Sequence, residues 1–515
     1  MASSLRRKLF LSALGLGAVL VPTLALPLFG NRRRFTTRSP SLIAPPYLFP
    51  TGFLWGTATA AYQIENTQND DWAAFERDVI AQDRVLQRAP GQALPGHIHR
   101  LSDFPEDVRQ KKTDFDARIE SDLQLAAEMK HNAYRFSISW SRLFPTEEQT
   151  EPDPLGLAYY RRIFDALDRY KLKPSVTLFH FVSPQWFWQE KEGKRGWERP
   201  DALALFERFV RAVVEHFGGR AEQWCTLNEP MVYAYAGYLD GTFPPLEKRS
   251  GPKELVPVVA QLLRAHALSY RLLKEDAARR GKPVSVGIAQ HVRTFAPLRN
   301  HNPLDRVTAM LIEQAFVWDF LDAIHSGVLR SKVMNVELAI PGLSGTQDFV
   351  GLNYYGRFYV KSSWRNPTKF EVLMHDPAQA GSDRPNELGW ASYPQGFQEA
   401  LCEAHNRYYL PIYVLENGTA DSKDKDVDRQ RLLVEHLREL YLARLQGADV
   451  RGYFHWSLID NFEWAEGFTA RFGLIKVDYQ NNFQRAPRAS AALYTRIIEQ
   501  SGLDSELLEQ FGPWP

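Results

Sequence analysis

The sequence predicts an α/β fold, a single (β/α)8 TIM barrel that follows an N-terminal hydrophobic signal or anchor segment. Short apolar runs alternate with longer amphipathic segments over most of the 515 residues, a pattern typical of parallel βαβ units. Eight such runs occur, which favours a closed barrel over an open sheet. A doubly wound sheet is the alternative, but no Gly-rich dinucleotide loop follows any of the runs.

The amino terminus is predicted to lie outside the barrel. Residues 9–29 carry no charge and have three basic residues on each side, and about 20 apolar residues can span a bilayer. An uncleaved anchor, a cleavable signal and a buried helix stay open as interpretations. The run Arg6-Arg7-Lys8 with the apolar residues after it also resembles a twin-arginine export signal. We expect a membrane-anchored or exported protein that associates with the membrane through residues 9–29, with its folded domain outside the cytoplasm.

Four segments follow from this organisation. Residues 1–30 form the signal or membrane anchor, residues 31–46 a Pro-, Ser- and Thr-containing linker, residues 47–502 the barrel and residues 503–515 a C-terminal tail. The predicted strands are Leu54–Ala58, Ala133–Ile138, Lys173–Leu178, Gln223–Leu227, Val284–Ala289, Phe349–Leu352, Ile412–Leu415 and Gly452–Trp456.

The intervals between the strands contain predicted helices and two irregular stretches. Apolar residues fall at helical spacing over 203–217 and again over 123–129. The stretch 77–112 has little periodicity, so we expect a long loop over one end of the barrel. The charged residues 421–428 are expected to form a solvated surface turn.

Composition excludes several classes of function. The net charge is +1, from 62 basic and 61 acidic residues, so no global field attracts nucleic acid. Two cysteines, Cys225 and Cys402, make neither a disulfide framework nor a Cys-rich metal site. Aromatic residues make up 13% of the chain, which suits a large core or a carbohydrate site. No metal-ligand set is apparent, and no cofactor is expected.

Polar side chains follow most of the predicted strands, and active sites of barrels lie at the carboxyl ends of their strands. No group is assigned to the fifth strand. The groups at the other strands are Gln63 and Glu65, Arg135, His180, Asn228 and Glu229, Asn353 to Tyr355, Glu416 and Asn417, and Trp456 with Glu463 and Trp464.

Two of these carboxylates, Glu229 and Glu416, suit the cleavage of glycosidic bonds. One carboxyl must be protonated to assist the leaving oxygen, and the other must be ionised to attack the anomeric carbon. Each carboxylate suppresses ionisation of its neighbour, and Arg135 is the candidate that keeps the nucleophile ionised. We expect the two carboxyl groups to stand ~5–5.5 Å apart, the separation of the retaining mechanism. A single Glu taken alone would more often be an ion pair or a helix cap.

Four motifs in order resemble the family 1 glycoside hydrolases, the β-glucosidase and β-galactosidase group. They are FLWGTATAAYQIE at 53–65, TLNEP at 226–230, LENG at 415–418 and WSLIDNFEW at 456–464. The resemblance spans about residues 53–479. Two positions depart from the usual pattern, Leu415 before the nucleophile and Phe181 after the sugar-binding histidine.

The resemblance implies a role for each matching residue. Glu229 would be the general acid/base and Glu416 the nucleophile, supported by Arg135 and Asn353. The side chains that would hydrogen-bond the sugar hydroxyls are Gln63, His180, Asn228, Glu463 and Trp464. Trp456 would stack against the sugar, Tyr355 would hydrogen-bond the nucleophile and Trp390 would line the aglycone side. Glu229 argues against a thioglucosidase, and the Glu463–Trp464 pair argues against a phospho-glycosidase. The substrate is therefore expected to be a neutral sugar.

Three functions stay open from the sequence. The first is a retaining β-glycosidase that acts on a small glycoside or a glycolipid. The second is a membrane-associated transferase, because residues 452–478 are also similar to the plant galactolipid galactosyltransferases of the family, and a sugar hydroxyl can intercept the same covalent intermediate. The third is a non-catalytic sugar-binding protein. Glucose or galactose preference, the aglycone and the oligomeric state do not follow from the sequence.

Overall fold

The computed structural model describes residues 44–81, 101–363, 365–379 and 383–512. Its main sheet has nine strands, and eight of them close into a barrel because β9 pairs with both β11 and β6. All eight neighbouring pairs are parallel, so the predicted barrel is confirmed. In barrel order the strands are β2 (Leu54–Ala58), β3 (Ala133–Ser137), β4 (Lys173–Phe179), β5 (Gln223–Asn228), β6 (Ser285–Pro297), β9 (Val350–Ser363), β11 (Ile412–Asn417) and β12 (Val450–Trp456).

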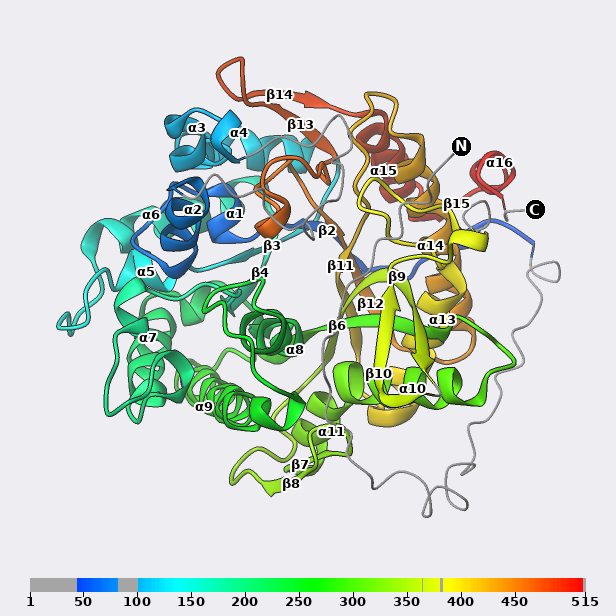
Figure 1. Cartoon of the computed structure of the whole chain (residues 1–515). Helices are drawn as coiled ribbons and strands as arrows, with labels where there is room; N and C mark the ends of the chain where they lie inside the picture. The colour runs from blue at the N-terminus through cyan, green and yellow to red at the C-terminus, as the bar shows by residue number, and fades with distance from the viewer. Residues whose placement is uncertain (1–43, 82–100, 364, 380–382, 513–515) are drawn as a thin grey trace.

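Helices surround these strands, as Figure 1 shows. Buried aromatic and aliphatic side chains fill the space between the two layers, including Trp140, Trp197 and Trp224. The main helices between the strands are α4 (Phe115–Glu128), α6 (Pro154–Tyr170), α7 (Ala202–Phe217), α9 (Val256–Arg280), α10 (Pro303–Glu313), α11 (Asp319–Ser326), α13 (Pro394–Tyr408), α14 (Val427–Leu445) and, after the last strand, α15 (Ala489–Glu499).

Local sequence signals account for the boundaries of several elements. The Asp153 side chain accepts a hydrogen bond from the Gly156 amide at the start of α6, and Pro154 occupies the first turn. In α7 the residues at helical spacing, among them Phe206, Val210 and Phe217, are buried. The parallel strands are buried on both faces, which explains why they appear in the sequence as continuous apolar runs.

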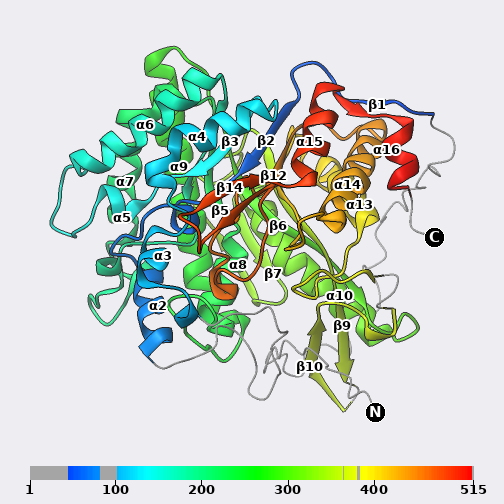
Figure 2. The same ribbon diagram turned by 90° about the horizontal axis from the view of Figure 1, so that it is seen from above.

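Two strands extend beyond the residues predicted for them. The predictions for β6 and β9 ended at Ala289 and Leu352, whereas β6 continues to Pro297 and β9 to Ser363. The end of β9 pairs with the antiparallel strand β10 (Asn366–Leu373). Figure 2 shows this β9–β10 hairpin projecting from the barrel, on the side opposite to β1 (Tyr47–Leu48). The hairpin therefore forms a wall beside the barrel mouth.

Residues 503–512 of the predicted C-terminal tail are folded. Strand β15 (Gly502–Leu503) pairs antiparallel with β1, and α16 (Ser505–Gln510) follows it. Leu507 and Phe511 are buried. The predicted boundary at residue 502 therefore falls within a strand, and the described domain reaches Phe511 and beyond it to residue 512.

The prediction of a long loop over 77–112 was wrong for the described residues. Helix α2 (Asp71–Ala81) covers its start and α3 (Glu106–Lys111) its end. Lys112 is fully buried, and its ammonium group contacts the Glu76 carboxylate at 2.6 Å. Weak periodicity misled the prediction, because a short helix that is held by a buried ion pair needs no apolar stripe.

The loop after β12 is fixed to the hairpin of β13 (Ile475–Asp478) and β14 (Gln484–Pro487). Fully buried Asp460 accepts hydrogen bonds from the Gly473 and Val477 amides and from both terminal nitrogens of Arg488, at 2.8–3.2 Å. Burial alone would raise the pKa of Asp460, but Arg488 and Arg471 hold it below its usual value. This carboxylate therefore positions the loop in which residues 463 and 464 lie.

The predicted signal or anchor at residues 1–30, with its apolar residues 9–29, and nearly all of the predicted linker lie outside the described residues. Within the described ranges, no helix combines the length and the apolar character needed to cross a membrane.

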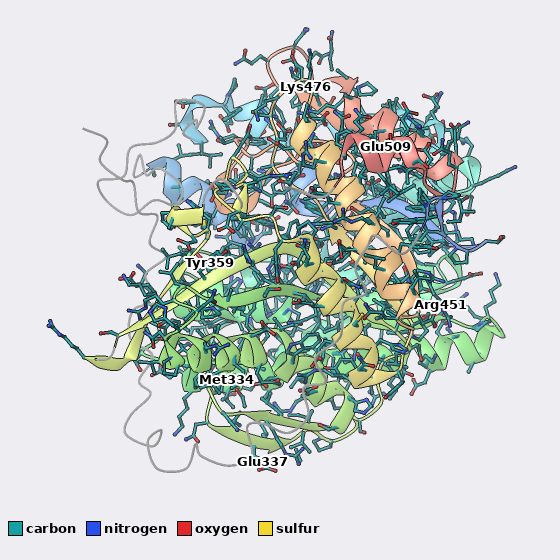
Figure 3. The ribbon with its side chains drawn as sticks, turned by 90° about the vertical axis from the view of Figure 1, so that its right-hand side faces the viewer. Met334, Glu337, Tyr359, Arg451, Lys476 and Glu509 are labelled. Carbon is teal, nitrogen blue, oxygen red and sulfur yellow. The ribbon has the colours of Figure 1, made fainter. Side chains whose placement is uncertain are left out.

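Replacing Asp460 by Ala is expected to lower the free energy of unfolding by about 3–5 kcal/mol, because Arg488 would stay buried without its partner. Urea titration followed by tryptophan fluorescence measures the change. The control is Glu337→Ala, which breaks an exposed ion pair with Arg330 at the outer edge labelled in Figure 3. That change should cost less than about 1 kcal/mol, and equal losses in the two variants would contradict the prediction.

Candidate active site

Two buried glutamates stand at the carboxyl ends of barrel strands. Glu229 directly follows β5 and Glu416 lies near the end of β11, and they are 6% and 4% exposed. Strands β6 and β9 lie between their two strands in the barrel. Both side chains line the same cavity, whose volume is about 350 Å³.

Glu416 is held from two sides. One carboxylate oxygen accepts a hydrogen bond from Arg135 on β3 at 2.5 Å, and the other accepts one from the Tyr355 hydroxyl on β9 at 2.8 Å. Burial raises the pKa of Glu416 to about 7; Arg135 opposes the rise and the neighbouring Glu229 adds to it. A charge-assisted pair of this kind fixes the orientation of the carboxylate as well as its charge.

Glu229 has different partners. Its Oε1 accepts a hydrogen bond from Asn353 Nδ2 at 2.8 Å and lies 3.1 Å from Nδ1 of His291. The residue is in the left-handed region with φ of 44° and caps the short helix α8 (Pro230–Ala234). Non-glycine residues in this region are uncommon and cluster at functional positions. The following Pro230 suits the first turn of that helix.

The ionisation of the two glutamates is coupled. Burial raises the pKa of Glu229, but His291 and Asn353 outweigh it, so that the net direction is downward. Arg135 beside Glu416 stays charged at all working pH values, and its hydrogen bond favours the ionised form of Glu416. Glu416 therefore contacts a permanent cation, whereas the contacts of Glu229 are with Asn353 and His291.

Asn228 links the two carboxylates. Its Oδ1 accepts hydrogen bonds from Arg135 at 2.7 Å and from Asn353 at 3.1 Å. A single amide oxygen thus joins the residue that holds Glu416 to the residue that holds Glu229. Any shift of Asn228 would change both sides of the site together.

Several buried polar atoms at this end of the cavity have no hydrogen-bond partner among the described residues. They are Gln63 Oε1, His180 Nδ1, Asn228 Nδ2 and Asn353 Oδ1. Burying a polar atom without a partner is costly, so such atoms mark where a ligand with several hydroxyl groups would bind. Donors and acceptors that converge in this way fit a sugar ring.

Glu463 extends the polar end of the cavity. Its Oε2 lies 3.3 Å from Gln63 Nε2 and 2.8 Å from Asn461 Nδ2. The indole nitrogen of Trp456 is 3.4 Å from the same oxygen. Burial raises the pKa of Glu463 to about 8, with Asn461 and Trp456 opposing it. The side chain is therefore held where it can accept hydrogen bonds from two hydroxyl groups of a ligand.

Aromatic rings line the cavity beside these polar groups. The His180 ring lies 6.1 Å from Trp456 and 5.9 Å from Trp464. Phe181 contacts Trp464 edge to face at 5.2 Å. Trp390 lies farther out and meets the Tyr355 ring at 5.7 Å. These rings offer flat apolar faces next to hydrogen-bonding groups.

The structure brings all twelve predicted residues together. Gln63, Arg135 and Asn353 support the wall through the hydrogen bonds described above. The other nine line the cavity directly: His180, Asn228, Glu229, Tyr355, Trp390, Glu416, Trp456, Glu463 and Trp464.

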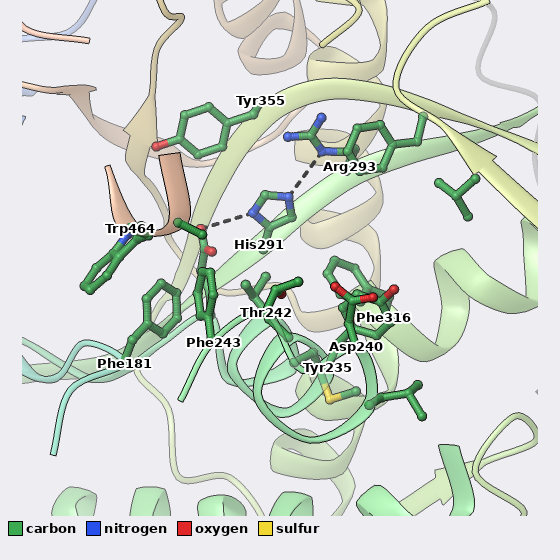
Figure 4. A pocket seen from close by; sticks show the side chains of 18 of the residues that line it. Phe181, Tyr235, Asp240, Thr242, Phe243, His291, Arg293, Phe316, Tyr355 and Trp464 are labelled. Carbon is green, nitrogen blue, oxygen red and sulfur yellow. Dashed lines mark hydrogen bonds and ion pairs between the residues drawn. The ribbon is translucent and has the colours of Figure 1, made fainter. Parts of the chain in front are cut away.

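Sequence reasoning missed two residues of β6 that lie beyond the predicted end of this strand. His291 contacts Glu229, and Arg293 Nε donates to His291 Nε2 at 3.3 Å; dashed lines mark both contacts in Figure 4. The signal was present, because Gln290, His291 and Arg293 come directly after the apolar run that ends at Ala289.

Among the described residues, no group of three or more His, Cys, Asp or Glu side chains is placed to hold a metal ion. Cys225 and Cys402 are buried thiols and neither lines the cavity.

Known proteins resemble this chain over most of its length. Residues 46–503 match the family model described as glycosyl hydrolase family 1. β-Glucosidase A of Thermotoga maritima is 31% identical over 476 residues, 88% of this chain and 99% of that protein. A β-glycosidase from Pyrococcus horikoshii has a TM-score of 0.77 and 36% identity, covering 91% of this chain and 99% of its own. A rice β-glucosidase mutant in a covalent complex with glucose has a TM-score of 0.75 and 29% identity, covering 87% and 98%.

Replacing Glu229 by Gln is expected to lower the pKa of Glu416 below about 7, because the neighbouring negative charge disappears. Carbon-13 NMR of glutamate-labelled protein measures this pKa. In the control variant Tyr355→Phe the pKa of Glu416 should rise, because this change removes a hydrogen bond that stabilises the ionised carboxylate. If the pKa of Glu416 stayed the same without Glu229, the two carboxyls would not be coupled.

Proposed function

The chain belongs to glycosyl hydrolase family 1, and on this premise we propose that Glu416 is the nucleophile and Glu229 the general acid/base of its reaction. The protein is a retaining β-glycosidase. The observation that supports the two roles best is the difference between their partners. Glu416 contacts a permanent cation, Arg135, whereas Glu229 contacts Asn353 and a titratable histidine.

In the first half of the reaction, Glu416 attacks the anomeric carbon and forms a glycosyl–enzyme ester. Glu229 gives its proton to the glycosidic oxygen as that bond breaks. Arg135 and Tyr355 hold the attacking carboxylate in place before the step, so little reorganisation is needed.

In the second half, Glu229 is ionised and takes a proton from water as the water attacks the anomeric carbon. The ester to Glu416 breaks and the sugar leaves with its original anomeric configuration. Neutralising Glu416 in the ester removes its repulsion of Glu229, which lowers the pKa of Glu229 when a base is required.

The sugar is proposed to bind over Trp456, with its hydroxyl groups shared among Gln63, His180, Asn228 and Glu463. Three of these side chains contribute the unpaired buried atoms described above. A phosphorylated sugar would place its negative charge beside the carboxylate of Glu463 when that group is ionised, so a neutral glycone is favoured.

Glu416→Ala is expected to reduce turnover of an aryl β-glucoside to background, because no glycosyl–enzyme can form. Glu229→Ala should slow an alkyl glucoside by ~10²–10⁴-fold, since its leaving oxygen needs a proton, and a dinitrophenyl glucoside far less. Steady-state kinetics with product analysis by proton NMR measures both the rate and the anomer that is released.

Added azide should rescue the Glu229→Ala variant and yield the β-glycosyl azide, because a small anion can attack the intermediate without a general base. First release of the α-anomer by the wild-type enzyme would overturn the nucleophile assignment. The same spectra separate free sugar from oligosaccharide or glycolipid products, and so distinguish hydrolysis from transfer.

His291→Asn is expected to move the alkaline limb of kcat/KM to higher pH. His291 lowers the pKa of Glu229, so its loss raises that pKa and keeps the acid protonated over a wider range. The pH profile with an alkyl glucoside measures the shift. Val292→Ala on the same strand is the control and should leave the limb in place. An unchanged limb or a shift to lower pH would show that His291 does not lower the pKa of Glu229.

A further inference from the structure

The cavity continues beyond the two glutamates into an apolar chamber. Its walls come from α8 with the π-helical turn η6 (Tyr235–Asp240), from α10 with the π-helical turn η8 (Gln314–Trp318), and from the β9–β10 hairpin. We define the apolar chamber by the side chains Val232, Leu239, Ile312, Phe316, Phe370 and Val372.

The chamber differs in chemistry from the sugar end of the same cavity. Aliphatic and aromatic side chains form most of the chamber wall. Asp240, the last residue of η6, and Thr242, which follows η6, also belong to the wall, as Figure 4 shows. Val232, Leu239, Ile312 and Phe316 keep part of their surface exposed inside the protein. An apolar occupant would remove that surface from water and gain the associated free energy.

Arg293 is the charged group at the junction between the two ends. It is 2% exposed, and its guanidinium lies 4.0 Å from the centre of the Phe358 ring and 4.8 Å from that of Trp390. Its Nη1 has no hydrogen-bond partner among the described residues. A ligand with one oxygen atom close to the glycosidic bond could accept a hydrogen bond from this nitrogen. The part of the ligand that lies deeper in the chamber would then need no polar groups.

The two π-helical turns are a second, independent observation. Both flank the chamber, η6 through Leu239 and η8 through Phe316. Such turns are rare and occur preferentially at functional sites, because they widen a helix locally and redirect its side chains. Two of them facing one space indicate that the shape of the chamber serves a ligand.

We propose that the chamber binds the aglycone of the substrate and that this aglycone is an extended hydrocarbon chain, as in a β-glycoside of a long-chain alcohol. The proposal rests on the proposed function, since the occupant is joined to the sugar that the glutamates cleave. A second sugar fits poorly, because its hydroxyl groups would lose water and find few partners. A hydrocarbon chain has no such groups to satisfy.

The test is a series of ethyl, butyl, hexyl and octyl β-glucosides at concentrations below their micelle limits, with cellobiose beside them. All four alcohols are equally poor leaving groups, so differences in kcat/KM report contacts with the chain. We expect kcat/KM to rise about fourfold for each methylene that enters the chamber. A value independent of chain length, or cellobiose as the better substrate, would overturn the proposal, whereas cleavage of the ethyl glucoside reports on the catalytic function alone.

Variants connect the effect to the chamber. Ile312→Asn places an amide in the wall and should lower the octyl-to-ethyl ratio of kcat/KM about tenfold. Leu445→Asn, at an exposed position far from the cavity, should keep the wild-type ratio. Circular dichroism establishes that each variant is folded, and Phe316→Asn serves as a second wall variant if the first is not. An unchanged octyl-to-ethyl ratio in a folded wall variant would show that the hydrocarbon chain of the substrate binds outside the apolar chamber.

Discussion

The ion pair between Arg135 and Glu416 is the interaction on which the site depends. Arg135 is fully buried in the barrel, and besides Glu416 it donates to the Leu415 carbonyl at 3.2 Å and to Asn228. One guanidinium thereby connects β3, β5 and β11 across the barrel. A buried cation is expensive to desolvate unless its partners are well placed, so the strands that carry those partners are held in one arrangement.

Much of the fold and of the site could be predicted because both depend on short stretches of sequence. The eight apolar runs mark the barrel strands, and the motifs place Glu229 and Glu416 directly at strand ends. The extension of β6 was missed because the polar residues Gln290, His291 and Arg293 end the apolar run, although this part of β6 continues to pair with β9. Contacts between distant segments are not visible in a sequence.

The charged stretch 421–428 shows the same limit. It was predicted to be a solvated turn, and residues 422–425, 427 and 428 are indeed exposed, yet Asp421 and Asp426 are buried. Asp426 pairs with Arg429 at 2.6 Å, and the Arg429 guanidinium also donates to the Asp421 carbonyl. Asp426 further accepts a hydrogen bond from the Ser490 amide at 3.1 Å, more than sixty residues later in the chain. A run of charged residues is therefore predicted to be exposed when the partners that allow some of them to be buried come from distant parts of the sequence.

Recognition is divided between two parts of one cavity. The sugar end relies on directional hydrogen bonds from strand ends, whereas the chamber relies on the apolar faces of helices and of the β9–β10 hairpin. The segment after β5 serves both, since Glu229 acts at the reacting bond and Val232 and Leu239 face the chamber. The glycone and the aglycone can therefore be selected by separate residues, although some of these residues lie only a few positions apart in the sequence.

The pairing of β1 with β15 has a consequence for how this protein can be handled. Residues 50–54, which join β1 to β2, line a hollow together with the first residues of β4, β5 and β6, so both ends of the described chain lie at the end of the barrel opposite the active site. Attachment of the described domain to a solid support through residue 44 or residue 512 would leave substrate access free. The pairing of Tyr47 with Leu503 also makes the described domain suited to circular permutation, with a linker that joins residue 512 to residue 44.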